Sequence, residues 1–273
     1  MSTSINNAFI TQYERDVHDI FQRNGSTLKP SVRFKSDVNG SVATFQKIGT
    51  GVATTKARHG TITPMNQTHT AVSTTLADFY AGDWVDKLDE AKINIDERQA
   101  IARGGAMALG RKVDSQILTE LDTTTQSTVT ITVTTSNQAR NGLLDMIEAM
   151  ITNDAYEPGN MYGVMSPHLW AVASTINEFA SSDYVGSDGL PFNTGAAVGM
   201  FKRWGQVLWT VHSGVPGVGT STSKVFVWNK NAIGYASGKV PANLAGTMGG
   251  ETSVGADITW HGDRAAHFVN HAM

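Results

Sequence analysis

The chain contains no cysteine, which excludes disulfides, thiolate metal sites and cysteine nucleophiles. Charged residues make up only 16% of its 273 residues, against roughly a quarter in an average soluble domain. The formal net charge of −3 leaves no cationic excess for gripping nucleic-acid phosphates. A surface poor in charge and rich in Gly, Ser, Thr and Asn suits burial against other subunits better than free solution.

The sequence also lacks long apolar runs. None approaches 18 residues, and residues 1–7 have neither the cationic nor the apolar region of a signal peptide. We therefore expect neither a membrane span nor export by a signal peptide. The chain is long enough to bury a substantial core, as one large domain or two modest ones.

The longest regular pattern predicts a helix over residues 96–122. Apolar residues recur there at steps of three and four, at Ala102, Ala106, Leu109, Val113, Ile117 and Leu121. At 1.5 Å per residue this helix is about 40 Å long. Gly104, Gly105 and Gly110 lie inside it, and each costs about 1 kcal/mol relative to Ala. We expect the helix to bend at these glycines or to be approached very closely by a neighbour.

Before this helix the sequence is rich in β-formers. An amphipathic helix over 4–23 is followed by a long hairpin within 32–80, predicted from the strand-like runs 32–34, 41–48 and 61–63. Its middle, residues 49–60, holds almost no large apolar side chain. Ordering it costs about 1–2 kcal/mol per residue, so this segment is expected to be mobile on its own.

After the long helix, strand and helix patterns alternate, which favours a compact α/β unit. A β-branched strand is predicted over 123–135, and Ser136 is predicted to cap the next helix. A buried strand at 162–165 leads into Ser166 as N-cap and Pro167 as first helical residue. A loop is predicted at 181–199, and further strands at 206–211, 224–228, 232–236, 251–261 and 264–270.

No motif predicts catalytic, cofactor-binding or metal-ligating residues. The segment 234–239 is one residue short of a phosphate loop and is followed by Val240. Residues 250–255 miss the spacing of a nucleophile elbow by one residue. Four carboxylates precede the long helix, and a solvated charge cluster explains them better than a general acid/base pair: Asp83, Asp86, Asp89 and Glu90.

Three histidines gather near the C-terminus. His267 and His271 are four residues apart and would share one face of a helix or strand, as metal ligands need, and His261 lies upstream. No HExxH motif or carboxylate pattern accompanies them. We interpret them as solvent-facing or subunit-contacting residues and predict no metal and no cofactor.

The order of several short motifs resembles a known family. After the β-rich segment the chain carries residues 86–91 (DKLDEA), Asp96-x-Arg98, Gly105-x-x-Ala108-Leu109, Asp114-x-x-Ile117-Leu118 and, later, residues 162–168 (YGVMSPH). In order and spacing they resemble the major capsid proteins of tailed bacteriophages, which have the Hong Kong 97 fold. The similarity covers nearly the whole chain, although each motif alone is weak.

The resemblance implies an α+β, Hong Kong 97-type capsid fold. Its parts would be an N-terminal arm at 1–31, an extended loop at 32–80, a peripheral domain at 81–128 and 237–273 with its spine helix at 96–122, and an α/β axial domain at 129–236.

The resemblance also implies a function. The chain would be the major capsid (coat) protein of a tailed double-stranded DNA bacteriophage, and no enzyme. Its copies would assemble as hexamers and pentamers in the host bacterial cytoplasm and close into the icosahedral head of the virion. The head would enclose DNA without sequence-specific binding and without a membrane.

Further partners follow from the same resemblance. We expect a portal protein and a separate scaffolding protein. The chain has one short helix where some relatives carry a long cleaved scaffold segment, which suggests a separate scaffolding protein or none. A decoration protein is left open. Some relatives form covalent cross-links between shell lysines and asparagines; Lys47 and Lys56 are the candidates here, without a matching motif.

Two alternatives remain open from the sequence. The first is an encapsulin-type nanocompartment shell, which would share the fold but enclose an enzyme. The second is a soluble α/β enzyme that uses the cluster of His261, His267 and His271.

Overall fold

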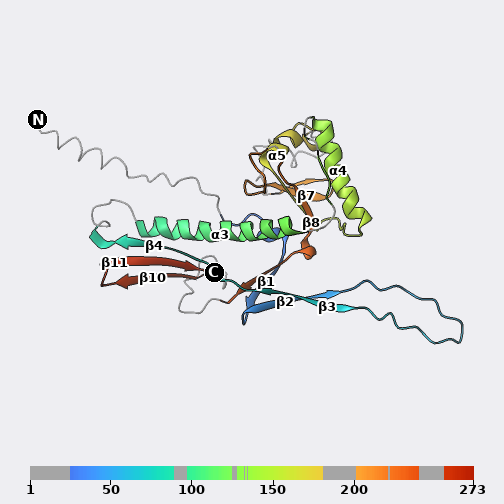
Figure 1. The fold of residues 1–273 in the computed structure, drawn as a ribbon, viewed down its shortest axis with the longest axis horizontal. Helices are drawn as coiled ribbons and strands as arrows, with labels where there is room; N and C mark the ends of the chain where they lie inside the picture. Colours follow the sequence, from blue (N-terminus) through green and yellow to red (C-terminus); the bar gives the residue numbers. More distant parts are fainter. Residues whose placement is uncertain are drawn as a thin grey trace, which may run out of the picture. The chain divides into compact units, whose positions relative to one another are not determined.

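The computed structural model describes residues 25–88, 97–124, 128–131, 133, 135–180, 201–220, 222–239 and 255–273. Its helices are α3 (Glu97–Thr123), α4 (Ser136–Thr152), α5 (Pro167–Ala173) and α6 (Asn177–Ala180), with 3-10 turns at Lys29–Ser31 and Lys230–Ala232 (Figure 1). Its strands are β1 (Arg33–Val38), β2 (Val42–Ile48), β3 (His69–Thr75), β4 (Tyr80–Asp86), β5 (Met161–Met165), β6 (Lys202–Trp204), β7 (Val207–Val211), β8 (Phe226–Asn229), β9 (Gly234–Gly238), β10 (Gly255–His261) and β11 (Ala266–Ala272). The helix expected over 4–23 and the loop expected over 181–199 lie outside the described residues.

The chain divides into two compact units. One contains Lys35–Gly105 and Ala236–Met273, and the other contains Asp19–Phe34 and Ala106–Tyr235. The division falls inside α3, directly after its glycine pair, so each unit takes one end of this helix. The four-part division into arm, loop, peripheral and axial domains stays a prediction.

Helix α3 confirms the helix predicted over 96–122 to within one residue at each end. The predicted apolar stripe is the buried one: Leu109, Val113, Ile117 and Leu121 are all at most 6% exposed. Sequence periodicity therefore identified both the helix and its buried face. None of the helices in the described residues is long and apolar enough to span a lipid bilayer.

The first unit contains a three-stranded antiparallel sheet in the order β10-β11-β4. Its register pairs Val269 of β11 with Asp83 of β4 and with Ile258 of β10. Alternate residues of a strand point to opposite faces of the sheet, so Val85, Val269 and His271 share one face, and all three are buried. Strands β4 and β11 thus supply the buried face of this unit, while β10 forms an exposed edge.

The second unit has its core between a four-stranded sheet and its helices. The strand order is β6-β7-β5-β8, with β5 parallel to β7 and antiparallel to β8. Trp209 is fully buried, and its ring lies 2.5 Å from where a Cβ on Gly163 would stand. The sheet and helices α4 to α6 together bury an apolar cluster: Ala139, Leu143, Ile147, Met161, Met165, Leu169, Ala173, Ile176, Phe179, Val207 and Trp209.

Local signals placed two helix starts in this unit. Ser166 accepts a hydrogen bond from the backbone N–H of Leu169 at 3.3 Å, and Pro167 is the first helical residue of α5, as predicted. In α4 the N-cap is Thr135, which accepts from Gln138 N, so Ser136 is the first helical residue rather than the cap. A neighbouring hydroxyl one position earlier took over the capping role.

Two predicted strands are wrong. Residues 61–63 form no strand, because β2 pairs instead with β3, so that Ile48 lies opposite His69. The described residues of the segment 123–135 form no strand either. There the β-branched side chains Ile131 and Val133 pack against the core, and Ile131 fills the space above Gly142 of α4. Burial rather than strand pairing accounts for this β-branched composition.

Candidate interaction surfaces

The hairpin β2–β3 is a separate two-stranded sheet. The chain that connects the two strands extends the hairpin well beyond their paired residues (Figure 1). Every residue of β3 is exposed. Beyond the ladder, Gly49 N donates to Thr68 O at 2.8 Å, and a turn closes the tip where Gly60 N donates to Ala57 O at 3.0 Å. Large apolar side chains lie in the open: 78% of Val52, 75% of Ile62 and 51% of Met65 is exposed.

This composition contradicts a role in the interior of one chain. A lone two-stranded hairpin is marginal in water, and here it carries apolar side chains that no described residue buries. The predicted mobility of residues 49–60 stays a prediction, but the exposure of this segment fits a surface that is completed by a partner.

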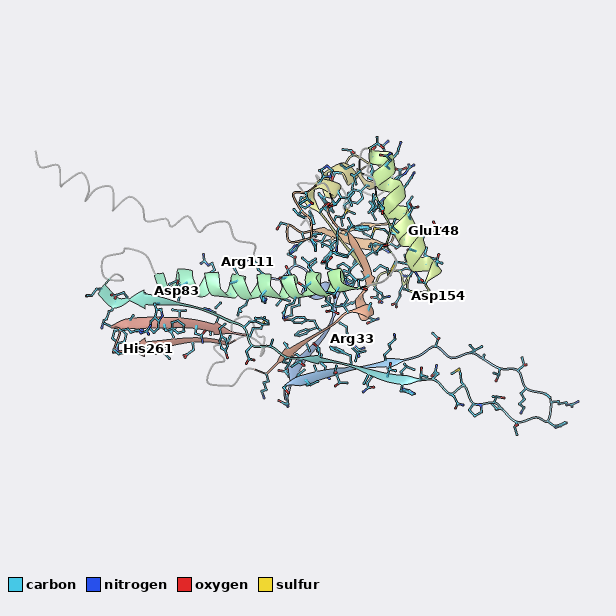
Figure 2. The ribbon with its side chains drawn as sticks, viewed as in Figure 1. Arg33, Asp83, Arg111, Glu148, Asp154 and His261 are labelled. Atoms are coloured by element: carbon cyan, nitrogen blue, oxygen red, sulfur yellow. The ribbon has the colours of Figure 1, made fainter. Side chains whose placement is uncertain are left out.

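The three-stranded sheet of the first unit exposes aromatic side chains on the face opposite the buried one. Trp84 of β4 contacts Phe268 of β11 at 4.7 Å between ring centroids and His261 of β10 at 5.0 Å. The guanidinium of Arg264 lies 4.5 Å from the centroid of the Trp84 ring. This cluster mixes cationic and apolar character, and Figure 2 labels His261 within it.

The buried face of the same sheet meets α3 at a glycine. A Cβ on Gly105 would lie 2.5 Å from Nδ1 of His271, which is fully buried. Nδ1 of His271 donates to the carbonyl of Ala81 at 3.2 Å, and its Nε2 has no hydrogen-bond partner among the described residues. Close approach therefore explains Gly105, whereas no described atom lies within 4 Å of a Cβ on Gly104.

The three C-terminal histidines do not converge. His261 lies on the sheet face opposite that of His267 and His271. The latter two share a face, but at about 3.3 Å per residue they are about 13 Å apart along β11. His267 instead contacts the ring of Trp260, with 4.8 Å between centroids. Within the part of the chain that the structure describes, no three His, Asp or Glu side chains converge as metal ligands do.

In the second unit, the carboxylate of Asp114 anchors a preceding segment of chain onto α3. It accepts hydrogen bonds from Ser26 Oγ, from N and Oγ1 of Thr27 and from Leu28 N, at 2.5 to 3.0 Å. One turn away, Gly110 leaves room for this segment, since a Cβ there would lie 2.6 Å from the carbonyl carbon of Gly25. The third helical glycine is thus also explained by close approach.

Asp114 is fully buried yet charged. Burial alone would raise the pKa of its carboxyl, but the hydrogen bonds from His212, Ser26, Thr27 and Leu28 together hold that pKa well below its usual range. The sequence marked Asp114 only as part of a motif of the resemblance and did not predict its burial, because a single Asp inside an amphipathic helix is ordinarily exposed.

The Asp114–His212 pair resembles the acid–histidine pair of a hydrolase, but both ring nitrogens of His212 already have hydrogen-bond partners. His212 Nδ1 accepts from the backbone N–H of Gly214 at 2.8 Å, so the ring proton sits on Nε2, which faces Asp114 Oδ2 at 3.2 Å. Beside the pair, α3 and the loop 212–216 line a groove of about 390 Å³ that includes the hydroxyls of Ser115 and Ser213. Because both ring nitrogens are used, His212 cannot take a proton from either hydroxyl.

A buried lysine closes one end of the second unit's core. Lys202 Nζ donates to the carbonyl of Phe179 and lies 3.9 Å from the centroid of the Phe179 ring. Burial lowers the pKa of Lys202 to about 8. Its ammonium caps the carbonyl end of α6, which is a structural role.

Helix α4 presents an acidic face to solvent. Asp145 and Glu148 are exposed on it, and Asp154 follows its end; Figure 2 labels Glu148 and Asp154. Leu144 and Ile151, 45% and 53% exposed, lie on the same stripe at helical spacing. The sequence contained a signal for this face, because no Lys or Arg occurs from 141 to 201.

The remaining sequence candidates are scattered. Asp83 and Asp86 lie on β4, while the other two carboxylates of that cluster, Asp89 and Glu90, fall outside the described residues. The segment 234–238 is strand β9 rather than a phosphate-binding loop. Lys47 and Lys56 are exposed on the hairpin, and their part in a cross-link stays a prediction.

The family model of phage capsid proteins matches residues 5–273 of this chain. A search of curated proteins finds no match. Because the family match spans nearly the whole chain, it covers both units, including the hairpin of the first unit.

Solved structures agree with this family. The capsid of the cyanophage P-SCSP1u has a TM-score of 0.70 and 13% identity, over 100% of this chain and 90% of that one. The mature capsid of bacteriophage PhiM1 has a TM-score of 0.64 at 11% identity, over 95% and 85%. The capsid of Ralstonia phage GP4 has 0.64 at 9%, over 95% and 87%.

At these identities the structural likeness establishes the fold, and the family match establishes the kinship. The predicted α+β capsid fold and the predicted role as a major capsid protein are confirmed, and the nanocompartment alternative is not favoured. The chain therefore belongs to the phage capsid protein family, as a major capsid protein.

Proposed function

We propose that copies of this chain close into an icosahedral shell of hexamers and pentamers, and that the hairpin fastens each subunit to the next. The observation that carries the proposal is the β2–β3 hairpin, which stands as a separate two-stranded sheet with β3 exposed along its whole length. Contacts between a hairpin on one copy and a different surface on the next are heterologous, and such contacts close into rings.

The energetics favour a partner for the hairpin. Val52 and Ile62 each expose three quarters or more of their surface, and burying a side chain of this size contributes about 1.5–3 kcal/mol. That gain offsets part of the entropy cost of ordering residues 49–68. With one hairpin per subunit, many modest contacts act together and make the finished shell durable.

The proposed shell function extends to the parts of the chain, to its partners and to the enclosed DNA. The chain acts as a structural protein with no catalytic residues and no cofactor, and its arm, extended loop, peripheral and axial parts follow the predicted boundaries. It assembles in the host cytoplasm with a portal and a separate scaffolding protein, and it encloses DNA without reading its sequence. An overall charge of −3 supports the last point, since packaged DNA is not held to the wall.

The test is to shorten the hairpin. Residues 49–68 are replaced by Asn-Gly, so that the last ladder pair, Ile48 and His69, is closed by a two-residue turn. The body should keep its melting temperature by circular dichroism, while analytical ultracentrifugation should show loose capsomers or monomers in place of shells.

A matched control keeps the hairpin length and replaces Thr54 and Thr55 with Ser; it should build normal shells. Normal shells from the shortened chain would show that the hairpin does not join neighbours. A lowered melting temperature would instead place the segment in the core of its own chain.

A further inference from the structure

Charge is strongly segregated along this chain. The stretch 41–77, which contains the whole hairpin, carries Lys47, Lys56 and Arg58 and no Asp or Glu. The chain as a whole has a net charge of −3, so this cationic stretch is a local exception. Lys56 precedes the turn from Ala57 to Gly60 at the tip, Arg58 lies within it, and both are exposed.

The opposite sign is concentrated on α4. From 141 to 201 there are seven Asp and Glu residues and no Lys or Arg. Of these carboxylates, Asp145, Glu148 and Asp154 are exposed on or just after α4, and Figure 2 labels the last two. Arg140, which precedes the stretch, is already paired with Glu178 at 2.8 Å.

Neither set of charges is satisfied within the described residues. Lys56 and Arg58 form no ion pair there, and neither do Asp145 and Glu148. Both surfaces also combine charge with exposed apolar side chains, Val52 and Ile62 on the hairpin and Leu144 and Ile151 on α4. The two surfaces are therefore complementary in charge and alike in their need for apolar burial.

Three other carboxylates in the described residues fit a cationic hairpin less well. Asp83 lies on the sheet where Arg264 and Lys87 already cover aromatic rings. Asp122 is paired with Lys224, and Asp114 is buried. The exposed face of α4 combines free carboxylates with exposed aliphatic side chains and lacks a neighbouring cation.

We propose that the tip of the hairpin docks on the exposed face of α4 in a second copy of this chain, with Lys56 and Arg58 against Asp145 and Glu148. This inference rests on the proposed shell function and names the surface that receives the hairpin. Pairing of opposite charges steers the two surfaces together and fixes their register, while the flanking apolar side chains supply burial.

The charge pairs predict salt dependence. The screening length falls from about 10 Å at 0.1 M salt to about 3 Å at 1 M, so the protein concentration needed for assembly should rise with salt. A contact carried by apolar burial alone would respond in the opposite direction or not at all.

The decisive experiment reverses each charged pair. One variant carries Lys56→Glu and Arg58→Glu, and the other carries Asp145→Lys and Glu148→Lys. Like charges across an interface are strongly repulsive, so each variant alone should need at least about tenfold more protein to assemble. Combining all four substitutions in one chain should restore assembly toward the wild-type concentration.

Mixing the two variants shows whether the contact lies between subunits. In a ring where they alternate, every reversed hairpin meets a reversed α4 and every native hairpin meets a native α4, so an equal mixture should assemble although neither variant does so alone. An even-membered ring can alternate completely, whereas a five-membered ring must retain one repulsive contact. The mixture should therefore favour six-membered rings over pentamers.

Each outcome is informative because wild type is measured beside the variants. Wild-type shells with reversed variants that assemble equally well, or that fail without rescue by combination or mixing, would overturn this docking. Absence of shells from wild type would instead count against the proposed function. The charge-preserving variant Lys56→Arg with Arg58→Lys should assemble normally, and unchanged melting temperatures of all variants would exclude misfolding.

Discussion

The two adjacent glycines of α3 should respond to alanine with opposite signs. At Gly104 no described atom lies within 4 Å of the new Cβ. The gain in helix propensity should therefore stabilise the folded subunit by about 1 kcal/mol. At Gly105 the new Cβ lies 2.5 Å from Nδ1 and 2.9 Å from Cε1 of His271. Replacing the pair together would mix these two effects, so they must be separated.

The magnitude at Gly105 follows from what surrounds His271. Its ring is fully buried and held by the hydrogen bond to Ala81 O at 3.2 Å, so it cannot move away without breaking that bond. Overpacking costs about 1–3 kcal/mol, and losing the hydrogen bond costs about 1 kcal/mol. After the propensity gain of about 1 kcal/mol, Gly105→Ala should destabilise the subunit by about 1–3 kcal/mol.

Urea unfolding of the unassembled subunit, followed by circular dichroism, measures both variants. The two free energies of unfolding should differ by about 2–4 kcal/mol. A His271→Ala background provides the control, because there the methyl group at position 105 should no longer be unfavourable. Equal effects of the two alanines, or no coupling between positions 105 and 271, would refute the close approach as the reason for this glycine.

Three further predictions concern buried and clustered groups. Asp114→Asn should lower the free energy of unfolding in urea at pH 7 by about 3 kcal/mol. Because folding lowers the pKa of Asp114, wild type should lose this advantage as the pH falls below 3.8. A difference between the two proteins that stays constant down to pH 2 would contradict this prediction. Since folding lowers the pKa of Lys202 from 10.5 to about 8, the free energy of unfolding should rise between those pH values, and Lys202→Met should remove the rise. Elemental analysis should find no stoichiometric zinc in the purified protein, and zinc that is lost on replacing His261, His267 or His271 would restore the metalloenzyme alternative.

Periodic features were predictable from the sequence. Helix α3 and its buried stripe, including Leu109 and Val113, follow from spacing alone, since a helix buries one face. The start of α5 follows from Ser166 and Pro167, whose capping chemistry is local. Such features need no knowledge of distant residues, which is why their positions agree to within a residue or two.

Features that depend on distant partners were not predictable. Strand β3 begins at His69 rather than at Thr61, because pairing with β2 decides the register and residue composition does not. The anchoring role of Asp114 depends on donors that are 86 to 88 residues earlier in the chain. The acidic face of α4 was visible as a stretch without Lys or Arg, but only the exposure of Leu144 and Glu148 shows that it is a surface.

Electron microscopy of the purified wild-type protein tests the central claim most directly. We expect closed shells built from rings of six and five subunits, with the hairpin of each subunit lying against its neighbour. Particles that remain monomers or small open oligomers at every protein and salt concentration, with the hairpin folded against its own chain, would contradict it.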